Sequence, residues 1–121
     1  MKRKIVVVED DQPILDLMEI LLKKLEYEPI LIPNGLDALS VVKADPPSLI
    51  LLDIMMSPLS GWEFLERLRR EYNLREIPVI LFTASSNVPE KLKTLNDPLV
   101  GVLQKPVTFD ELRAAIEKFL G

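Results

Sequence analysis

The sequence predicts an α/β fold in which five parallel strands alternate with helices. Short apolar runs are separated by segments whose apolar residues recur at helical spacing, in units of about 24 residues. The runs consist almost entirely of Val, Ile and Leu without polar alternation, which is typical of strands buried on both faces of a parallel sheet. Turn-forming residues lie between the two kinds of segment.

The first two units carry clear strand and helix signals. The run Lys4–Val8 is the first predicted strand, and residues 13–25 carry an apolar stripe at helical spacing. Asp11 precedes this helix and is expected to cap it. The second strand, residues 29–32, contains a proline, which indicates a position at the edge of the sheet. A short helix is predicted over residues 34–43.

The remaining three predicted strands each lead to a polar residue. They cover residues 49–52, 79–82 and 99–103, and they lead to Asp53, Thr83 and Lys105, respectively. Ser60 with Glu63, and Thr108 with Glu111, match the capping-box pattern that begins a helix. We therefore expect helices over residues 60–72 and from 108 nearly to 121, with a short helix at 89–96. No linker remains, so we expect one domain over residues 1–121.

Composition excludes several classes of function. The chain has a net charge of −4 and no run of Lys or Arg, which argues against direct nucleic-acid binding. No apolar run is long enough to cross a membrane or to act as an export signal. With no cysteine, disulfides and thiolate chemistry are excluded. We expect a cytoplasmic protein.

The absence of histidine narrows the chemistry further. A histidine-dependent catalytic triad or the usual zinc site cannot form without imidazole. A metal bound by this chain is therefore expected to be a hard cation held by oxygen atoms, which points to Mg²⁺.

Chemistry-bearing residues follow four of the predicted strands. Glu9 and Asp10 follow the first, Asp53 the third, Thr83 the fourth and Lys105 the fifth. Because the ligand crevice of such a sheet lies beyond the carboxyl ends of its strands, these residues should meet at one rim. Each residue alone has a structural explanation, as a cap, a strand-end hydroxyl or a solvated lysine. Three clustered carboxylates, however, repel one another unless a cation lies among them.

A carboxylate at such a rim can act as a nucleophile. A bound Mg²⁺ would shield Asp53 from the charge of an incoming phosphoryl group, so that Asp53 could attack phosphorus and form an acyl phosphate. Thr83 and Lys105 could then hydrogen-bond to the transferred oxygen atoms and neutralise them.

Taken together, these motifs resemble the response-regulator receiver domains of bacterial two-component signalling, over residues 4–120. Glu9-Asp10 matches the family's acidic pair, and Asp53 in Leu-Leu-Asp-Ile-Met-Met matches its phosphoacceptor. Thr83 in Leu-Phe-Thr-Ala-Ser matches the switch hydroxyl. Lys105-Pro106 matches the family's lysine and the proline after it.

The resemblance implies a doubly wound, flavodoxin-like (βα)5 sheet of strand order 2-1-3-4-5. It also implies that Mg²⁺, or Mn²⁺ in its place, is bound by Glu9 (often through water), Asp10, Asp53 and the main-chain carbonyl of Met55. The Lys105–Pro106 peptide bond is expected to be cis, which would turn the lysine back toward the crevice.

The role implied by the resemblance is that of a signalling switch. Asp53 would take a phosphoryl group from a sensor histidine kinase or a histidine phosphotransfer protein, and the altered surface would be recognised by an unknown downstream protein. No membrane or nucleic-acid partner is implied. The domain would not be an enzyme, except that it catalyses its own phosphorylation and dephosphorylation.

The first helix could supply part of the kinase-docking surface. Eight apolar residues cover an arc of about 220° on it, which is wider than the usual core stripe. They are Ile14, Leu15, Leu17, Met18, Ile20, Leu21, Leu22 and Leu25. Burial of the excess under the last helix is an equally good explanation.

Three features depart from the family pattern. Ser57, followed by Pro58, stands where the family usually has a proline, which favours extended angles at Ser57 and a different loop path. Val102 stands where the family often has Tyr or Phe, so the aromatic half of the usual switch is missing. The loop at residues 96–101 lacks the family's common Gly-Ala-Asp-Asp run.

Two other functions stay open. A phosphatase of the haloacid-dehalogenase type also uses an aspartate after a buried strand, but it typically has a second aspartate where this chain has Met55. A receiver-like binding module that works without phosphorylation is favoured by Ser57 and Val102, and disfavoured by the complete set of site residues. A nucleotide enzyme is disfavoured because the four glycines form neither a GxGxxG motif nor a P-loop.

Overall fold

The computed structural model of the chain describes residues 2–84 and 94–121. It contains a five-stranded sheet in the order β2-β1-β3-β4-β5, and all of its pairings are parallel. The strands are β1 (Lys4–Val8), β2 (Glu28–Ile32), β3 (Leu49–Asp53), β4 (Val79–Thr83) and β5 (Val100–Gln104). The predicted fold class and strand order are confirmed.

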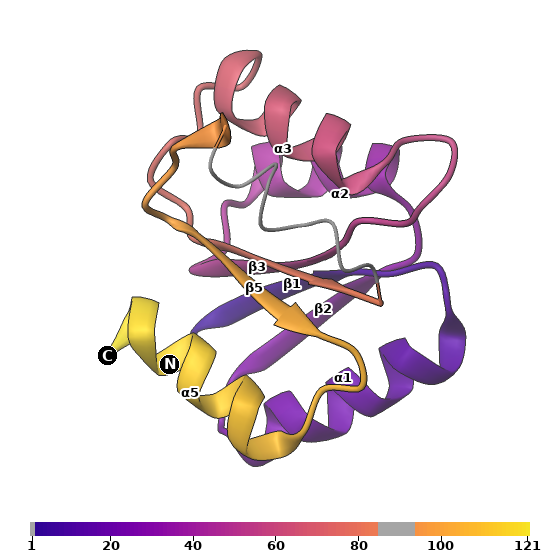
Figure 1. Ribbon diagram of the computed structural model, residues 1–121, viewed down its shortest axis with the longest axis vertical. Coiled ribbons are helices and arrows are strands. Elements are labelled where there is room, and N and C mark those ends of the chain that lie inside the picture. Colours follow the sequence, from indigo (N-terminus) through magenta and orange to yellow (C-terminus); the bar gives the residue numbers. More distant parts are fainter. Residues whose placement is uncertain (1, 85–93) are drawn as a thin grey trace.

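Helices cover both faces of this sheet. They are α1 (Gln12–Lys24), α2 (Gly35–Ala44), α3 (Gly61–Arg70) and α5 (Phe109–Leu120). Figure 1 shows α2 and α3 on one face and α1 and α5 on the other, which is the doubly wound arrangement. The short helix predicted at residues 89–96 falls largely outside the described residues.

Burial along the strands follows from their place in the sheet. β3 and β4 are buried over their whole length, because neighbouring strands flank them and helices cover both faces. β2 lies at an edge, as its proline predicts, and Pro29 pairs in register with Ile5 of β1. The pure apolar runs in the sequence are therefore explained by burial on two sides.

Alternate strand residues supply two separate hydrophobic cores. Ile50 and Leu52 of β3 belong to the core beneath α2 and α3, whereas Leu49 and Leu51 belong to the core beneath α1 and α5. Both cores extend to the carboxyl ends of the strands, so the residues that follow the strands rest on a closely packed base.

The helix N-caps predicted from the sequence are confirmed. The side chain of Asp11 accepts a hydrogen bond from the backbone N–H of Ile14. Ser60 with Glu63, and Thr108 with Glu111, form reciprocal capping boxes at the starts of α3 and α5. Each cap contributes about 1 kcal/mol. They make α1, α3 and α5 begin shortly after the loops that leave β1, β3 and β5.

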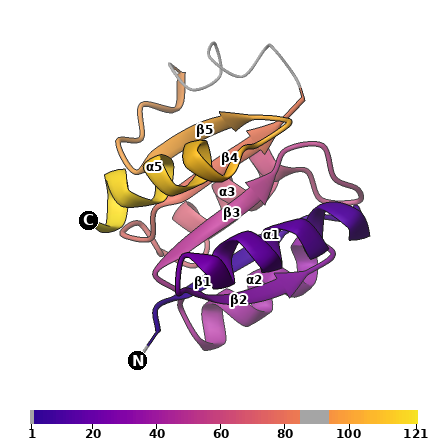
Figure 2. The same cartoon turned by 90° about the horizontal axis from the view of Figure 1, so that it is seen from below.

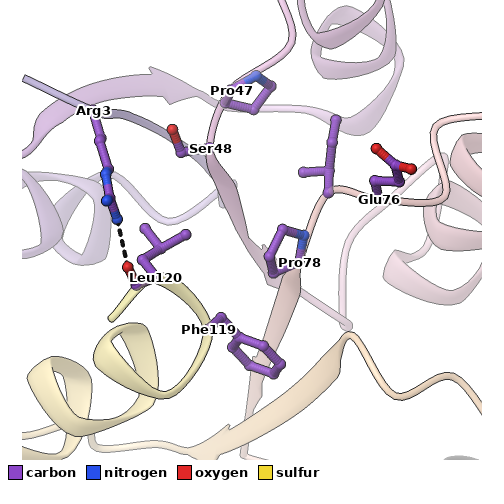
Figure 3. Close-up of a pocket in the computed structure, with 8 residues that line it drawn as sticks. Arg3, Pro47, Ser48, Glu76, Pro78, Phe119 and Leu120 are labelled. Carbon is purple, nitrogen blue, oxygen red and sulfur yellow. Dashed lines mark hydrogen bonds between the residues drawn. The ribbon is translucent and has the colours of Figure 1, made fainter.

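The start of the described chain and the C-terminus lie at the other end of the sheet. Figure 2 shows both on the side where the strands begin. There the Nη1 atom of Arg3 donates a hydrogen bond of 2.7 Å to the carbonyl oxygen of Leu120, beside an open pocket between Pro78 and Phe119 (Figure 3). Arg3 thereby satisfies one of the backbone carbonyls left free at the end of α5.

In the part of the chain that the structure describes, none of the helices combines the length and the hydropathy that a membrane span requires.

Candidate functional site

The residues predicted to meet at one rim do so at the carboxyl ends of the strands. We call this set the rim site: Glu9 and Asp10 after β1, Asp53 at the end of β3, Thr83 at the end of β4, and Lys105 after β5. β3 lies between β1 and β4, so Asp53 occupies the middle of the set.

Three carboxylates of the rim site form one cluster. Glu9, Asp10 and Asp53 each offer an oxygen atom, and these atoms lie within 4.8 Å of one another. Glu9 and Asp53 are only 1% and 3% exposed, whereas Asp10 is open to solvent. The cluster is therefore a pair of buried acids with a third at the opening. Carboxylate oxygens in this number are suitable ligands for a hard divalent cation.

Lys105 brings one positive charge to the cluster. Its Nζ atom lies 3.2 Å from Oε1 of Glu9 and 3.6 Å from Oδ2 of Asp53. One ammonium group opposite three carboxyl groups would leave the site with an excess of negative charge if all three were ionised. Because two of these carboxylates are buried, solvent screens that excess poorly.

The pKa of Glu9 responds to this environment. Burial and the neighbouring Asp53 raise the pKa of Glu9 from 4.5 to about 8, although the Lys105 ammonium acts in the opposite direction. The Oε2 atom of Glu9 is buried and has no hydrogen-bond partner among the described residues. A buried oxygen without a partner is costly, and a bound cation would satisfy it. The chemistry of this donor set therefore fits a divalent metal ion.

The two carboxylate oxygens of Asp53 have different partners. Its Oδ1 atom accepts a hydrogen bond of 3.1 Å from the backbone N–H of Met55, while Oδ2 lies toward Lys105. The main chain of Met55 therefore lies beside the Asp53 carboxylate, as its predicted role requires, and the Met55 side chain is exposed.

Thr83 closes the rim site on the β4 side. It is 1% exposed, and its carbonyl oxygen accepts a hydrogen bond of 2.9 Å from the backbone N–H of Lys105. This contact joins the end of β4 to the residue after β5. All the residues predicted for the site thus lie at this end of the sheet.

Comparison with known proteins identifies the kind of domain that this site belongs to. Residues 5–117 match the family model of the response regulator receiver domain. The chain belongs to this family. The N-terminal domain of a response regulator receiver protein from Methanoculleus marisnigri is 38% identical to it, with a TM-score of 0.79 over 98% of this chain and 97% of that one.

Two further solved structures are similar to this receiver domain. The receiver domain of a sensor histidine kinase from Pseudomonas aeruginosa, which has a magnesium ion coordinated in its active-site cleft, is 25% identical, with a TM-score of 0.88 over 100% of this chain and 99% of that one. The chemotaxis protein CheY4 from Vibrio cholerae is 21% identical, with a TM-score of 0.88 over 98% and 99%, which supports the fold alone.

Sequence reasoning missed Gly61, which lies against the loop of the receiver domain after Asp53. A Cβ atom at this position would lie 2.6 Å from the carbonyl oxygen of Asp53 and 2.7 Å from Cα of Ile54. The Gly61 N–H donates a hydrogen bond to the Ile54 carbonyl. Only glycine fits this approach without moving the backbone that holds Asp53. The available signal was a glycine directly after the cap residue Ser60.

The departures from the family pattern have visible structural counterparts. The Lys105–Pro106 bond is cis, as predicted, and the Ser57–Pro58 bond is also cis, which was not predicted. In the unusual loop before β5, Asp97 forms an ion pair of 2.9 Å with Arg69 of α3. Val102, at the position where the family often has Tyr or Phe, is 36% exposed on β5.

Proposed function

We propose that this receiver domain is a phosphoryl-accepting switch in which Asp53 takes the phosphoryl group from a phosphohistidine of a sensor histidine kinase or a histidine phosphotransfer protein. The observation that carries the proposal is the buried Asp53 carboxylate beside two further acids and Lys105. Modification of Asp53 changes the charge of the rim, and a downstream protein would read the altered surface.

Glu9, Asp10 and Asp53 would hold Mg²⁺, together with the main-chain carbonyl of Met55. When bound, the ion would supply positive charge that offsets the repulsion between the carboxylates and an incoming phosphoryl group. The unpartnered Oε2 of Glu9 and the magnesium in the cleft of the Pseudomonas aeruginosa receiver domain support this assignment. Mn²⁺ has the same ligand preference and is expected to replace it.

The transfer itself is a substitution at phosphorus. A carboxylate oxygen of Asp53 forms the new bond to phosphorus, and the bond from phosphorus to the donor's imidazole nitrogen breaks. The donor leaves as neutral imidazole when its other ring nitrogen carries a proton. The product is an acyl phosphate on Asp53. In this proposal the domain would catalyse only its own phosphorylation and dephosphorylation.

Lys105 and Thr83 would act on the transferred group. The ammonium of Lys105 already lies 3.6 Å from Asp53, so a small movement would bring it to a phosphoryl oxygen. The hydroxyl of Thr83, one strand away, would donate to another oxygen of the group. These contacts would stabilise the charge that develops in the transition state and remain in the product.

The exposed apolar residues of α1 are a candidate docking surface for the donor. Leu17 and Ile20 are 45% and 54% exposed, so α5 does not cover the whole of the wide apolar arc. These exposed residues are therefore available to contact a donor protein. The double variant Leu17→Ser, Ile20→Ser should slow transfer from a donor protein without slowing transfer from acetyl phosphate.

The test of the proposed function uses acetyl phosphate as the donor. The chain should gain one phosphoryl group in the presence of Mg²⁺, measured by mass spectrometry of the intact protein, and Asp53→Asn should gain none. Asp45→Asn is the matched control, because Asp45 pairs with Lys4 away from the rim and should be labelled like the wild type.

Equal labelling of Asp53→Asn would refute the assignment of the acceptor. Absence of labelling in the wild type, with the fold intact, would instead support a binding module that works without phosphorylation. Continuous release of inorganic phosphate from small phosphate esters over many turnovers would support a phosphatase.

A further inference from the structure

The Lys105 side chain lies over the aromatic ring of Phe82. Its Nζ atom lies 5.1 Å from the centroid of the Phe82 ring. This is within the distance at which the negative face of an aromatic ring attracts a cation. Phe82 is 1% exposed, so the ring has a fixed place in the core beneath the lysine.

The register of the sheet explains why the ring lies there. Phe82 of β4 pairs with Asp53 of β3 on one side and with Leu103 of β5 on the other. Partners in parallel register point their side chains to the same face of a sheet, and Phe82 and Leu103 both lie in the core beneath α1 and α5. The Lys105 side chain therefore passes over Phe82 on its way to Asp53 and Glu9.

We propose that Phe82 is a positioning residue, whose ring holds the Lys105 ammonium at the place where it meets the phosphoryl group on Asp53. The inference rests on the proposed function, since it concerns the same site. The ion pairs with Glu9 and Asp53 attract the ammonium, but the flexible four-carbon stem of a lysine could still reach them by more than one path at the opening of the rim, where the Lys105 side chain is 21% exposed.

A ring has an advantage over a further acidic residue in this place. It attracts the ammonium through its quadrupole, but it adds no net charge to a site that already has three carboxylates. It also takes no strong hydrogen bond from the ammonium, so the N–H donors of Lys105 stay available to phosphoryl oxygens. A carboxylate would hold the lysine but would repel the incoming phosphoryl group.

The alternative is that Phe82 only fills the core. Phe82→Leu and Ile80→Val separate the two explanations, because both remove buried carbon atoms from the same face of β4 and only the first removes a ring beneath Lys105. Phe82→Tyr retains the ring. A site-specific pentafluorophenylalanine at position 82 keeps the ring shape and reverses the polarity of its face, which covers the case that Phe82→Leu does not fold.

The first measurement is the NMR spectrum of the Lys105 ε-methylene group, assigned with Lys105→Arg. We expect an upfield ring-current shift in the wild type and in Phe82→Tyr, and its loss in Phe82→Leu but not in Ile80→Val. In the pentafluoro protein the lysine should leave the ring and the shift should also be lost. An unchanged Lys105 signal in Phe82→Leu and in the pentafluoro protein would overturn the proposal.

The second measurement is the rate of Mg²⁺-dependent labelling by acetyl phosphate. Phe82→Leu and the pentafluoro protein should be slower than the wild type by about two- to fivefold, with Phe82→Tyr and Ile80→Val close to it. Equal slowing in Ile80→Val would mean that packing alone is responsible, and would overturn the proposal. If the wild type is not labelled at all, the proposed function fails, and the Lys105 signal alone decides whether the ring holds the lysine.

Discussion

Two charged clusters in this receiver domain differ in how their charges are balanced. The rim site gathers Glu9, Asp10 and Asp53 around the single ammonium of Lys105. The second, which we call the Arg69 cluster, consists of one guanidinium and one carboxylate, those of Arg69 and Asp97. The first has an excess of negative charge, whereas the second is neutral as a pair.

Arg69 and Asp97 form several hydrogen bonds to other groups of the protein. The Nε atom of Arg69 lies 2.9 Å from Asp97, and Nη1 donates to the carbonyls of Leu74 and Ile77 at 2.7 Å each. The other oxygen of Asp97 accepts from the backbone N–H of Leu99. The cluster therefore joins the end of α3 to the segments before β4 and β5, and it explains what the unusual loop at residues 96–101 contributes.

The Arg69 cluster has a structural role, whereas the rim site is suited to bind a ligand. Each has one buried polar atom without a partner among the described residues, Oε2 of Glu9 and Nη2 of Arg69, so such an atom alone does not identify a site. The balance of charge within each cluster distinguishes the two. An ion pair that is matched one to one needs nothing further, whereas the excess of acids at the rim site raises the pKa of Glu9 and favours a cation.

The largest effect on stability should come from Arg69→Ala. This change leaves Asp97 and two backbone carbonyls without their partner, and should lower the free energy of unfolding by about 3–5 kcal/mol. Arg70→Ala is the control, because Arg70 is the next residue but is exposed and pairs with Glu66 in solvent. It should change stability by less than about 0.5 kcal/mol. Urea denaturation measures both, and equal losses would contradict the structural role.

Gly61→Ala should lower stability and also disturb the rim site. The new Cβ atom would lie 2.6 Å from the Asp53 carbonyl oxygen and must displace backbone, so we expect a loss of about 2 kcal/mol and slower labelling by acetyl phosphate. Gly35→Ala is matched, since both glycines are the first residue of a helix. There the nearest atom to the Cβ would be the side-chain end of Leu59 at 3.1 Å, which can move, and the Leu59 carbonyl oxygen would lie at an ordinary contact distance of 3.5 Å.

In Gly35→Ala we expect stability within about 0.5 kcal/mol of the wild type, measured by the same denaturation, with unchanged labelling. If the two variants behave alike, the close approach of Gly61 to the Asp53 backbone has no special importance.

The pH dependence of stability should differ with and without Mg²⁺. The folded-state pKa of Glu9, about 8, lies above its ordinary value of 4.5, so the folded chain holds this proton more tightly than the unfolded chain. The resulting stabilisation is fully present below about pH 4.5 and is lost as the pH rises toward 8. Without Mg²⁺ the fall between about pH 6 and about pH 8 should be about 2 kcal/mol.

Mg²⁺ should raise the melting temperature more at the upper end of this range, because it binds the ionised carboxylates. Glu9→Gln removes the titrating group and should flatten the dependence in metal-free buffer. A wild-type stability that rises with pH over this range would contradict the charge imbalance at the rim.

The smallest effect should be at β5 on phosphorylation. Val102 has few rotamers and no ring, so it cannot make the aromatic swing common in the family. We expect small amide chemical-shift changes at Val102 compared with those at Thr83. Changes of equal size at both residues would indicate that another side chain supplies the relay. We also expect the loop after β4 to shift on phosphorylation, and most of that loop lies outside the described residues.

Much of the fold could be predicted because its signals are local. The strand Lys4–Val8 was predicted with its observed bounds, and the caps at Asp11, Ser60 and Thr108 were each read from a few neighbouring residues. The rim site could also be predicted, because a parallel sheet brings the ends of its strands to one edge.

The features that were missed depend on contacts between distant parts of the chain. The ion pair of Arg69 and Asp97 joins residues 28 positions apart, and the sequence around either residue contains no pattern that predicts it. The place of Phe82 beneath Lys105 requires the register of β4 against β5 as well as the path of a flexible side chain. The approach of Gly61 to Asp53 requires the packing angle of α3. Periodicity and capping patterns contain none of this information.

The hydrogen bond from Arg3 to Leu120 has a practical consequence for measuring these reactions. It holds the start of the described chain against the end of α5, at the end of the sheet opposite to Asp53 (Figure 2). A fluorophore or an affinity tag attached at either terminus would therefore project away from the rim. The domain could be immobilised on a biosensor surface by either end, with the acidic opening and the exposed side of α1 still facing the solution in which a donor protein is supplied.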